Sequence, residues 1–195
     1  MNAQVDKTTL LNTLSLWNRY LKRTVRIIAC GGTALTLLNL KESTKDVDFL
    51  IPEQSEYRYL IKIMLDLGYK QTTGTGWQKN RGFIFDLFIG KTIFTTELLE
   101  SPLELGNHIP YKEFSSIYLG ILNYYDLIIS KLFRFTPVDT DDCLALFKEK
   151  SKEISLDRLK SRFHETSAYD ISDEKNRNNF KHFLELLKKE KLIDG

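Results

Sequence analysis

An apolar run in the first part of the chain ends abruptly at two glycines. Residues 25–30 have the short, β-branched character of a strand, and Gly31-Gly32 follows directly. The apolar cluster at residues 34–40 then predicts a helix that starts just after the glycine pair. A strand that passes through a glycine turn into a helix indicates a sheet with helices packed on it, so we expect a mixed α/β fold.

Segments of both kinds continue along the chain. The predicted strands are residues 47–51, 69–72, 77–79 and 83–89, and the predicted helices of this first part are residues 10–21 and 55–67. Residues 97–113 are predicted to be loop with short elements. From Asn123 onward the spacing is helical, with helices predicted at residues 123–135, 141–150, 155–166 and 173–191.

This pattern predicts the fold class α/β (α+β), in which a mixed sheet flanked by helices is followed by a C-terminal helical region. We expect two domains, residues 1–120 with the mixed sheet and residues 121–195 as a helical bundle. No flexible linker is indicated between them.

Composition limits the partners. The chain has 28 Lys and Arg against 26 Asp and Glu, a net charge of +2, so any nucleic acid would need a local basic patch rather than bulk attraction. The N-terminus lacks the order of a signal peptide. Residues 116–133 form the most apolar stretch, but Asp126 and Lys131 interrupt it, which favours a buried helix over a membrane span. We therefore expect a cytoplasmic protein with no membrane partner.

The cysteines and histidines give no sign of a metal centre. Cys30 and Cys143 each stand alone in apolar surroundings, as reduced core residues of a cytosolic protein do. His108, His164 and His182 are far apart and are not spaced for a zinc site.

Three aspartates lie where a buried sheet would not place them by default. Asp46 and Asp48 flank Val47 in a predicted strand, so both carboxylates point to the same face. Such close like charges repel, and a divalent, oxygen-preferring ion resolves the conflict. Asp86 lies inside the strand FIFDLFI and would complete a three-carboxylate cluster if the two strands are neighbours.

Each of these aspartates also has a structural explanation. An Asp-x-Asp segment is compatible with a solvated loop or a helix cap. Asp86 could instead pair with Arg81 or Lys91.

The glycine pair offers a second functional component. A strand that runs into Gly31-Gly32 and then a helix lets the backbone approach a phosphate closely, with helix N–H groups and the Thr33 hydroxyl as donors. A simple turn is the alternative explanation. The later Gly74-Thr75-Gly76 segment is predicted to be a turn between strands, and it lacks the third glycine of a dinucleotide-binding loop.

The combination of these motifs is more specific than either alone. Cys30-Gly31-Gly32, then thirteen residues, then Asp46-Val47-Asp48-Phe49 resembles the signature of the nucleotidyltransferase superfamily, which has the polymerase-β-like fold. That superfamily keeps a third acid on a later strand, where this chain has Asp86. With Gly31-Gly32-Thr33-Ala34-Leu35 and Thr44-Lys45-Asp46-Val47-Asp48, the resemblance narrows to a minimal type that includes the type IV abortive-infection toxins of toxin–antitoxin systems. It covers residues 24–150.

This resemblance implies roles for individual residues. Asp46, Asp48 and Asp86 would be the catalytic residues and the ligands of Mg²⁺ or Mn²⁺. Gly31, Gly32 and Thr33 would hold the phosphates of the nucleotide. Lys131 matches the family's phosphate-binding lysine, although helical spacing alone favours a salt bridge to Asp126 or Asp139. Asp139 and Asp142 match a following Asp-x-x-Asp pair, whose roles stay open because a Thr-Pro-Val stretch precedes Asp139 here.

The implied activity is metal-dependent transfer of a nucleoside monophosphate from an NTP to an acceptor hydroxyl, with release of pyrophosphate. The toxin resemblance suggests RNA, such as tRNA, as the acceptor and a small antitoxin protein as a partner. A protein or a small molecule stays open as the acceptor, as does a non-catalytic module that binds a nucleotide or a partner. The basic residues closest in sequence to the site are Lys41, Lys45, Lys79, Arg81 and Lys91.

Overall fold

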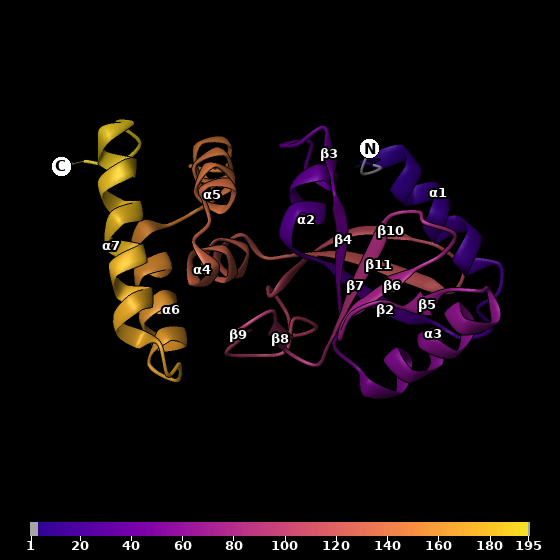
Figure 1. Cartoon of the computed structure of the whole chain (residues 1–195). Helices are drawn as coiled ribbons and strands as arrows, with labels where there is room; N and C mark the ends of the chain where they lie inside the picture. Colours follow the sequence, from indigo (N-terminus) through magenta and orange to yellow (C-terminus); the bar gives the residue numbers. More distant parts are fainter. Residues whose placement is uncertain (1–3, 195) are drawn as a thin grey trace. The chain divides into compact units, whose positions relative to one another are not determined.

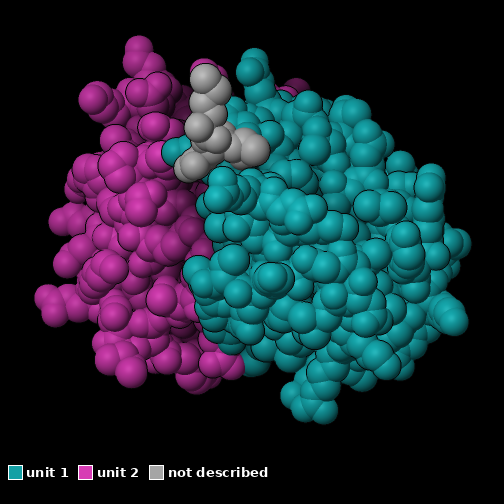
Figure 2. Space-filling view, turned by 45° about the vertical axis from the view of Figure 1, so that its right-hand side comes forward, with its two compact units in different colours: residues 1–93, 100–123 teal, residues 94–99, 124–195 magenta. Residues whose placement is uncertain are grey.

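The computed structural model describes residues 4–194, which divide into two compact units. Within this range, the first unit comprises residues 4–93 and 100–123, and the second comprises residues 94–99 and 124–194. Figure 2 shows the two units in different colours. The chain passes into the helical unit at Asn123/Tyr124, and a short upstream segment also belongs to that unit.

The first unit contains a mixed sheet and three helices (Figure 1). Its main strands are β2 Val25–Ala29, β4 Asp46–Ile51, β5 Lys70–Gln71, β6 Gly76–Gln78, β7 Ile84–Ile89, β10 His108–Glu113 and β11 Ile117–Leu122. Its helices are α1 Lys7–Asn18, α2 Gly31–Leu37 and α3 Gln54–Asp66. The shorter strands are β1 Val5–Asp6, β3 Ser43–Thr44 and β8 Thr92–Ile93.

The sheet order is β10-β11-β2-β4-β7-β6-β5 within the described residues. The pairs β11–β2 and β4–β7 are parallel, and the other neighbours are antiparallel. The expected mixed sheet flanked by helices is therefore confirmed. Because β4 and β7 are adjacent and parallel, the two acid-bearing segments lie side by side.

The two faces of these central strands have different neighbours. Val47 lies opposite Phe85 in the register of β4 and β7, and the Trp17 ring of α1 packs on Phe85 with centroids 4.6 Å apart. Helix α2 lies against the other face, where the main-chain N–H of Gly32 donates to the Asp48 carboxylate. Alternation along a strand thus separates a buried aromatic face from an acidic one.

Helix α2 begins earlier than the sequence predicts. The expected start was after the glycine pair, but the helix includes Gly31 and Gly32, and Cys30 is its N-cap. Glycine has a low helix propensity, so local preferences place it outside a helix. Here the contact of the glycines with β4 overrides that preference.

Strand β11, just before the helical unit, was not predicted. The apolar stretch 116–133 favoured a buried helix, but β11 occupies its first part, and α4 begins at Tyr124, close to the helix predicted at residues 123–135. Strand β11 pairs with β10, which falls in the stretch predicted to be loop. A short apolar run buried in a sheet has no alternation that distinguishes it from a buried helix segment.

The second unit is helical, with helices α4 Tyr124–Arg134, α5 Pro137–Glu149, α6 Leu156–Ser167 and α7 Asp173–Lys189, and it also holds the strand β9 Thr96–Glu97. Its core is aromatic: Phe163 stacks on Phe180 with centroids 4.1 Å apart, and Phe147 meets Phe183 edge-on. Within residues 4–194, no helix combines the length and apolar character that crossing a membrane requires.

Candidate active site

The register of β4 and β7 brings two acids together. Asp48 and Asp86 are direct partners across the parallel pair, and adjacent strands are about 4.8 Å apart. Asp46 lies two residues before Asp48, on the same face. The structure therefore places the three predicted acids on one face of two neighbouring strands.

The glycine pair is built around the Asp48 carboxylate. Gly31 has a φ of +54°, and a Cβ added there would overlap Oδ2 of Asp48. The N–H of Gly32 donates to the same oxygen at 3.2 Å. A Cβ on Gly32 would come within 2.6 Å of the Thr44 hydroxyl. Asp48 is only 8% exposed. Gly31 therefore needs to be glycine because the Asp48 carboxylate fills the space beside it, and Gly32 because the Thr44 hydroxyl does.

Thr33 fixes the backbone of the Asp-Val-Asp segment. Its side chain is fully buried, and its Oγ1 accepts a hydrogen bond from the N–H of Asp48 at 2.8 Å. The same hydroxyl lies 3.5 Å from the carbonyl oxygen of Asp46, to which it donates. Thr44 donates to that carbonyl oxygen at 2.8 Å. In this structure the Thr33 hydroxyl thus supports the strand that carries the acids.

Asp86 is half-buried, and its partner is a residue that sequence reasoning missed. The hydroxyl of Thr75 donates to Asp86 Oδ1 at 2.8 Å. Thr75 precedes β6, which pairs with β7. The one feature of the sequence that could have indicated this contact is the position of Thr75 in the Gly74-Thr75-Gly76 turn, shortly before the strand that contains Asp86. Neither the turn nor Thr75 carried a sequence motif for this role.

The acids leave negative charge on this face. The pKa of Asp46 is raised above its ordinary value, first by burial and second by the negative charge of Asp86, while Lys45 acts in the opposite direction. Carboxylate oxygens that repel one another suit an oxygen-preferring divalent cation. The donor set therefore fits Mg²⁺ or Mn²⁺ by its chemistry.

The side chains do not form a closed three-ligand site. Among the described residues, no three His, Cys, Asp or Glu side chains are placed to hold one metal ion. Asp48 turns Oδ2 to the N–H of Gly32 in α2, whereas Asp86 turns Oδ1 to Thr75 beside β6. The acids share a face as expected, but the three-carboxylate cluster is not assembled, because local donors orient two of the carboxylates toward different elements.

Lys131 belongs to the second unit, where it lies in a buried charge network. It is 2% exposed, and its ammonium is 2.7 Å from Asp142 Oδ2 and 3.4 Å from Asp139 Oδ1. The salt bridge to Asp139 that helical spacing favoured is therefore present, and a closer one to Asp142 accompanies it. Asp126, the other spacing-based partner, is paired with Arg162.

Asp139 is also the third residue of α5, where it takes part in the N-terminal cap of the helix. Thr136 and Asp139 form a capping box, and Arg134 lies 2.6 Å from Asp139 Oδ1. Burial, the largest single influence, acts to raise the pKa of Asp139. The Thr136 hydrogen bond and the charges of Arg134 and Lys131 outweigh it and hold that pKa below its ordinary value.

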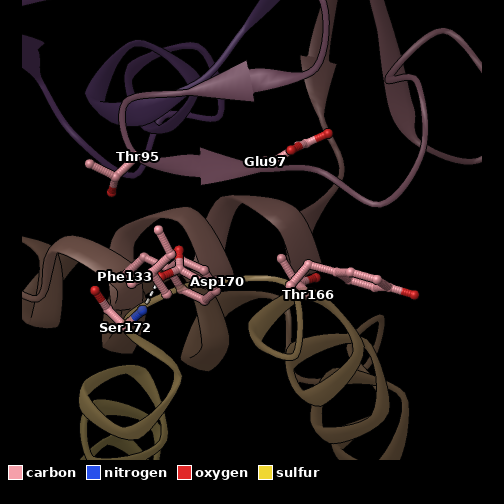
Figure 3. A pocket seen from close by; sticks show the side chains of 8 residues that line it. Thr95, Glu97, Phe133, Thr166, Asp170 and Ser172 are labelled. Atoms are coloured by element: carbon pink, nitrogen blue, oxygen red, sulfur yellow. Dashed lines mark hydrogen bonds between the residues drawn. The ribbon is translucent and has the colours of Figure 1, made fainter.

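The second unit also has a surface pocket of about 340 Å³ (Figure 3). The pocket lies among β9, α4, α6 and the turn before α7, and its lining includes Thr95, Glu97, Phe133, Thr166 and Asp170. In Figure 3, Thr95 and Glu97 come from one side, and Asp170, which accepts the N–H of Ser172 at 2.6 Å, comes from the other. None of the residues predicted for the site lines it.

Comparison with known proteins agrees with the fold. A family model described as "Nucleotidyltransferase of unknown function (DUF6036)" matches residues 109–192, which is less than half of the chain. No curated protein matches the sequence.

Two solved structures are similar to most of the chain. A crystal structure of ANT(2″)-Ia in complex with adenylyl-2″-tobramycin has a TM-score of 0.55 and 12% identity, covering 83% of this chain and 97% of that one. A solution structure of the antibiotic-resistance factor ANT(2″)-Ia has a TM-score of 0.55 and 11% identity, covering 82% of this chain and 91% of that one. The chain therefore has a nucleotidyltransferase-like α/β fold with a C-terminal helical region.

Proposed function

We propose that this protein is a nucleotidyltransferase that moves a nucleoside monophosphate from an NTP to an acceptor hydroxyl. The observation that carries the proposal is the pairing of Asp48 with Asp86 on adjacent parallel strands, with Asp46 on the same face and the Gly31-Gly32 turn against Asp48. The nucleotidyltransferase-like fold and the family model that matches residues 109–192 support it.

The three acids have distinct parts in this proposal. Asp46 and Asp48 would hold the cation together with the triphosphate, and Asp86 would complete its ligands or accept the proton of the acceptor hydroxyl. Mg²⁺ or Mn²⁺, when bound there, supplies positive charge that stabilises the attacking and leaving oxygens. The acceptor oxygen forms a bond to the α-phosphorus, the α–β phosphoanhydride bond breaks, and pyrophosphate leaves.

The glycine turn and Lys131 provide the remaining contacts. Gly31 and Gly32 would present main-chain N–H groups to the β and γ phosphates, and the N–H of Gly32 would then leave the Asp48 carboxylate to which it donates in this structure. The buried Thr33 holds the strand beside them. Lys131 is proposed to neutralise the departing phosphates. Its ion pairs with Asp142 and Asp139 would then be shared or exchanged when the nucleotide binds.

Two acceptor classes follow from two different observations. The toxin-like motif from Gly31 to Asp48 supports RNA, such as tRNA, with a small antitoxin protein as partner. The similarity to ANT(2″)-Ia, whose crystal structure is a complex with adenylyl-2″-tobramycin, supports a hydroxyl-bearing small molecule as the acceptor. Both acceptors use the same site and the same donor chemistry, so one experiment separates them.

The test is incubation with each α-labelled NTP and Mg²⁺ or Mn²⁺, with total tRNA in one arm and tobramycin in the other. We expect label on one acceptor class and none with Asp46→Asn/Asp48→Asn. Asp66→Asn, an exposed change at the end of α3, is the matched control and should retain transfer. Label transfer that survives the double substitution would contradict the proposal. NTP binding without transfer to any acceptor would favour a non-catalytic nucleotide-binding module.

A further inference from the structure

The Gly74-Thr75-Gly76 turn has no part in the function proposed above, yet it lies beside one of the acids. Gly76 is the register partner of Asp86 across β6 and β7. The N–H of Leu87 donates to the carbonyl oxygen of Thr75 at 3.0 Å, and the Thr75 hydroxyl donates to Asp86 Oδ1 at 2.8 Å. Thr75 is therefore tied to β7 through both its backbone and its side chain, at the position of the acid.

The loop that carries Thr75 has a defined shape. The Gln71 side-chain amide donates to the carbonyl oxygen of Gly74 at 2.8 Å. The N–H of Gly76 donates to the Thr73 hydroxyl at 2.9 Å, and the N–H of Thr72 donates to the carbonyl oxygen of Gly76 at 2.8 Å. A Cβ on Gly76 would overlap the Thr73 hydroxyl. These contacts fix the turn before any ligand binds, so the Thr75 hydroxyl is presented to Asp86 by a pre-organised backbone.

A hydrogen bond to a carboxylate both orients it and selects between its two oxygens. Bonds to an ionised acceptor are stronger than neutral ones, and such outer partners set the orientation of residues that bind cations. Asp86 needs such a partner because its neighbours across and along the sheet, Asp48 and Asp46, carry the same charge and supply no donor. Thr75 supplies one from the opposite side, through β6.

We propose that Thr75 is the positioning residue for Asp86. Its hydroxyl occupies Oδ1 and fixes the carboxylate rotamer, which directs Oδ2 to the cation and the acceptor hydroxyl. This inference rests on the nucleotidyl-transfer function proposed above, but the orientation of Asp86 itself is a property of the ligand-free protein.

Three variants separate the effect of the Thr75 hydroxyl from the effect of a change in the turn itself. Thr75→Val removes the donor at nearly constant volume, and Thr75→Ser restores it. Thr72→Val is the matched control, because its hydroxyl lies in the same turn and donates to the carbonyl oxygen of Gly76 at 3.3 Å rather than to Asp86. Scalar couplings of the Asp86 carboxyl carbon report the χ1 rotamer without any ligand, and an electron paramagnetic resonance titration reports Mn²⁺ binding.

We expect one Asp86 rotamer in the wild type, Thr75→Ser and Thr72→Val, and rotamer averaging in Thr75→Val. Mn²⁺ affinity and kcat should fall about 10-fold in Thr75→Val, with the KM for NTP unchanged, and Thr75→Ser should recover both. A single rotamer in Thr75→Val overturns the inference, as does a Thr75→Ser variant that is as impaired as Thr75→Val. If Thr75→Val shows rotamer averaging and weaker Mn²⁺ binding but the wild type transfers no label, Thr75 is the positioning residue of Asp86 and the proposed function is wrong. A wild type that binds no Mn²⁺ overturns both.

Discussion

At the scale of single residues, the glycine pair shows how one motif serves two purposes. Gly31 has a positive φ, which an L side chain rarely adopts, and its missing Cβ leaves the space that Asp48 fills. The same absence of a side chain is what the proposed phosphate contact needs. The packing of Asp48 and the approach of a phosphate therefore both require a residue without a side chain at position 31.

Gly31→Ala should destabilise the protein more than a glycine replacement that meets only backbone strain. Gly90→Ala is the control, since Gly90 has a φ of +74° and nothing within 4 Å of an added Cβ. The control should lose about 1–2 kcal/mol of unfolding free energy through strain. Gly31→Ala should lose a further ~1–3 kcal/mol because the new Cβ overlaps the Asp48 carboxylate. Urea denaturation of the two variants checks this, and equal losses would show that Asp48 does not crowd Gly31.

Lys131 is the other residue whose role depends on its surroundings. Lys131→Met should lower the unfolding free energy by about 3–5 kcal/mol, because it removes the ammonium that lies 2.7 Å from the buried Asp142 carboxylate. Adding Asp142→Leu should recover much of this loss, so the two changes should not be additive. A double-mutant cycle by urea denaturation measures the coupling. Additive losses would mean that the ion pair contributes nothing to folding.

At the scale of elements, the junction of α4 and α5 links helix capping to electrostatics. Pro137 begins α5, Thr136 caps it, and Asp139 closes the capping box while it pairs with Arg134. The first turn of α5 therefore depends on an ionised Asp139. This dependence makes the junction sensitive to acid.

The sign of the pH effect follows from the lowered pKa of Asp139. Because the folded-state pKa lies below the unfolded value, the stabilisation is present above about pH 4 and is lost as the pH falls through the folded pKa. Asp139→Asn should therefore reduce stability at pH 7 and lose less on acidification than the wild type. Asp141→Asn, an exposed change in the same helix, should behave like the wild type. Urea denaturation at pH 7 and pH 3 measures this, and parallel acid losses in all three proteins would contradict it.

The sequence was a good guide to elements whose signals are local. Asp6 caps α1 by accepting the N–H of Thr9 at 2.7 Å, and Gly68 ends α3 with a φ of +87°, both as their residue types indicate. Strand β11 was missed because its assignment depends on a parallel partner, β2, far away in the chain. No local pattern reports such a pairing.

At the scale of the whole molecule, the order of motifs along the chain predicted the fold class, and the sheet explains why the three acids share one face. The spacing of Asp46 and Asp48 indicated a shared face, and the parallel pairing of β4 with β7 adds Asp86. The sequence could not predict the partners of these carboxylates, because Gly32 and Thr75 reach them through tertiary contacts. The division of the chain into a sheet unit and a helical unit follows the change in periodicity near Asn123.

In the proposed function, the acids on β4 and β7 direct attack on the α-phosphorus of an NTP. A comparison of α-labelled with γ-labelled NTP, in the presence of Mn²⁺ and the acceptor that the wild type modifies, tests this. We expect α label on the acceptor, γ label in pyrophosphate, and loss of both in Asp48→Asn. Appearance of the γ label on the acceptor, or α-label transfer unchanged in Asp48→Asn, would contradict it.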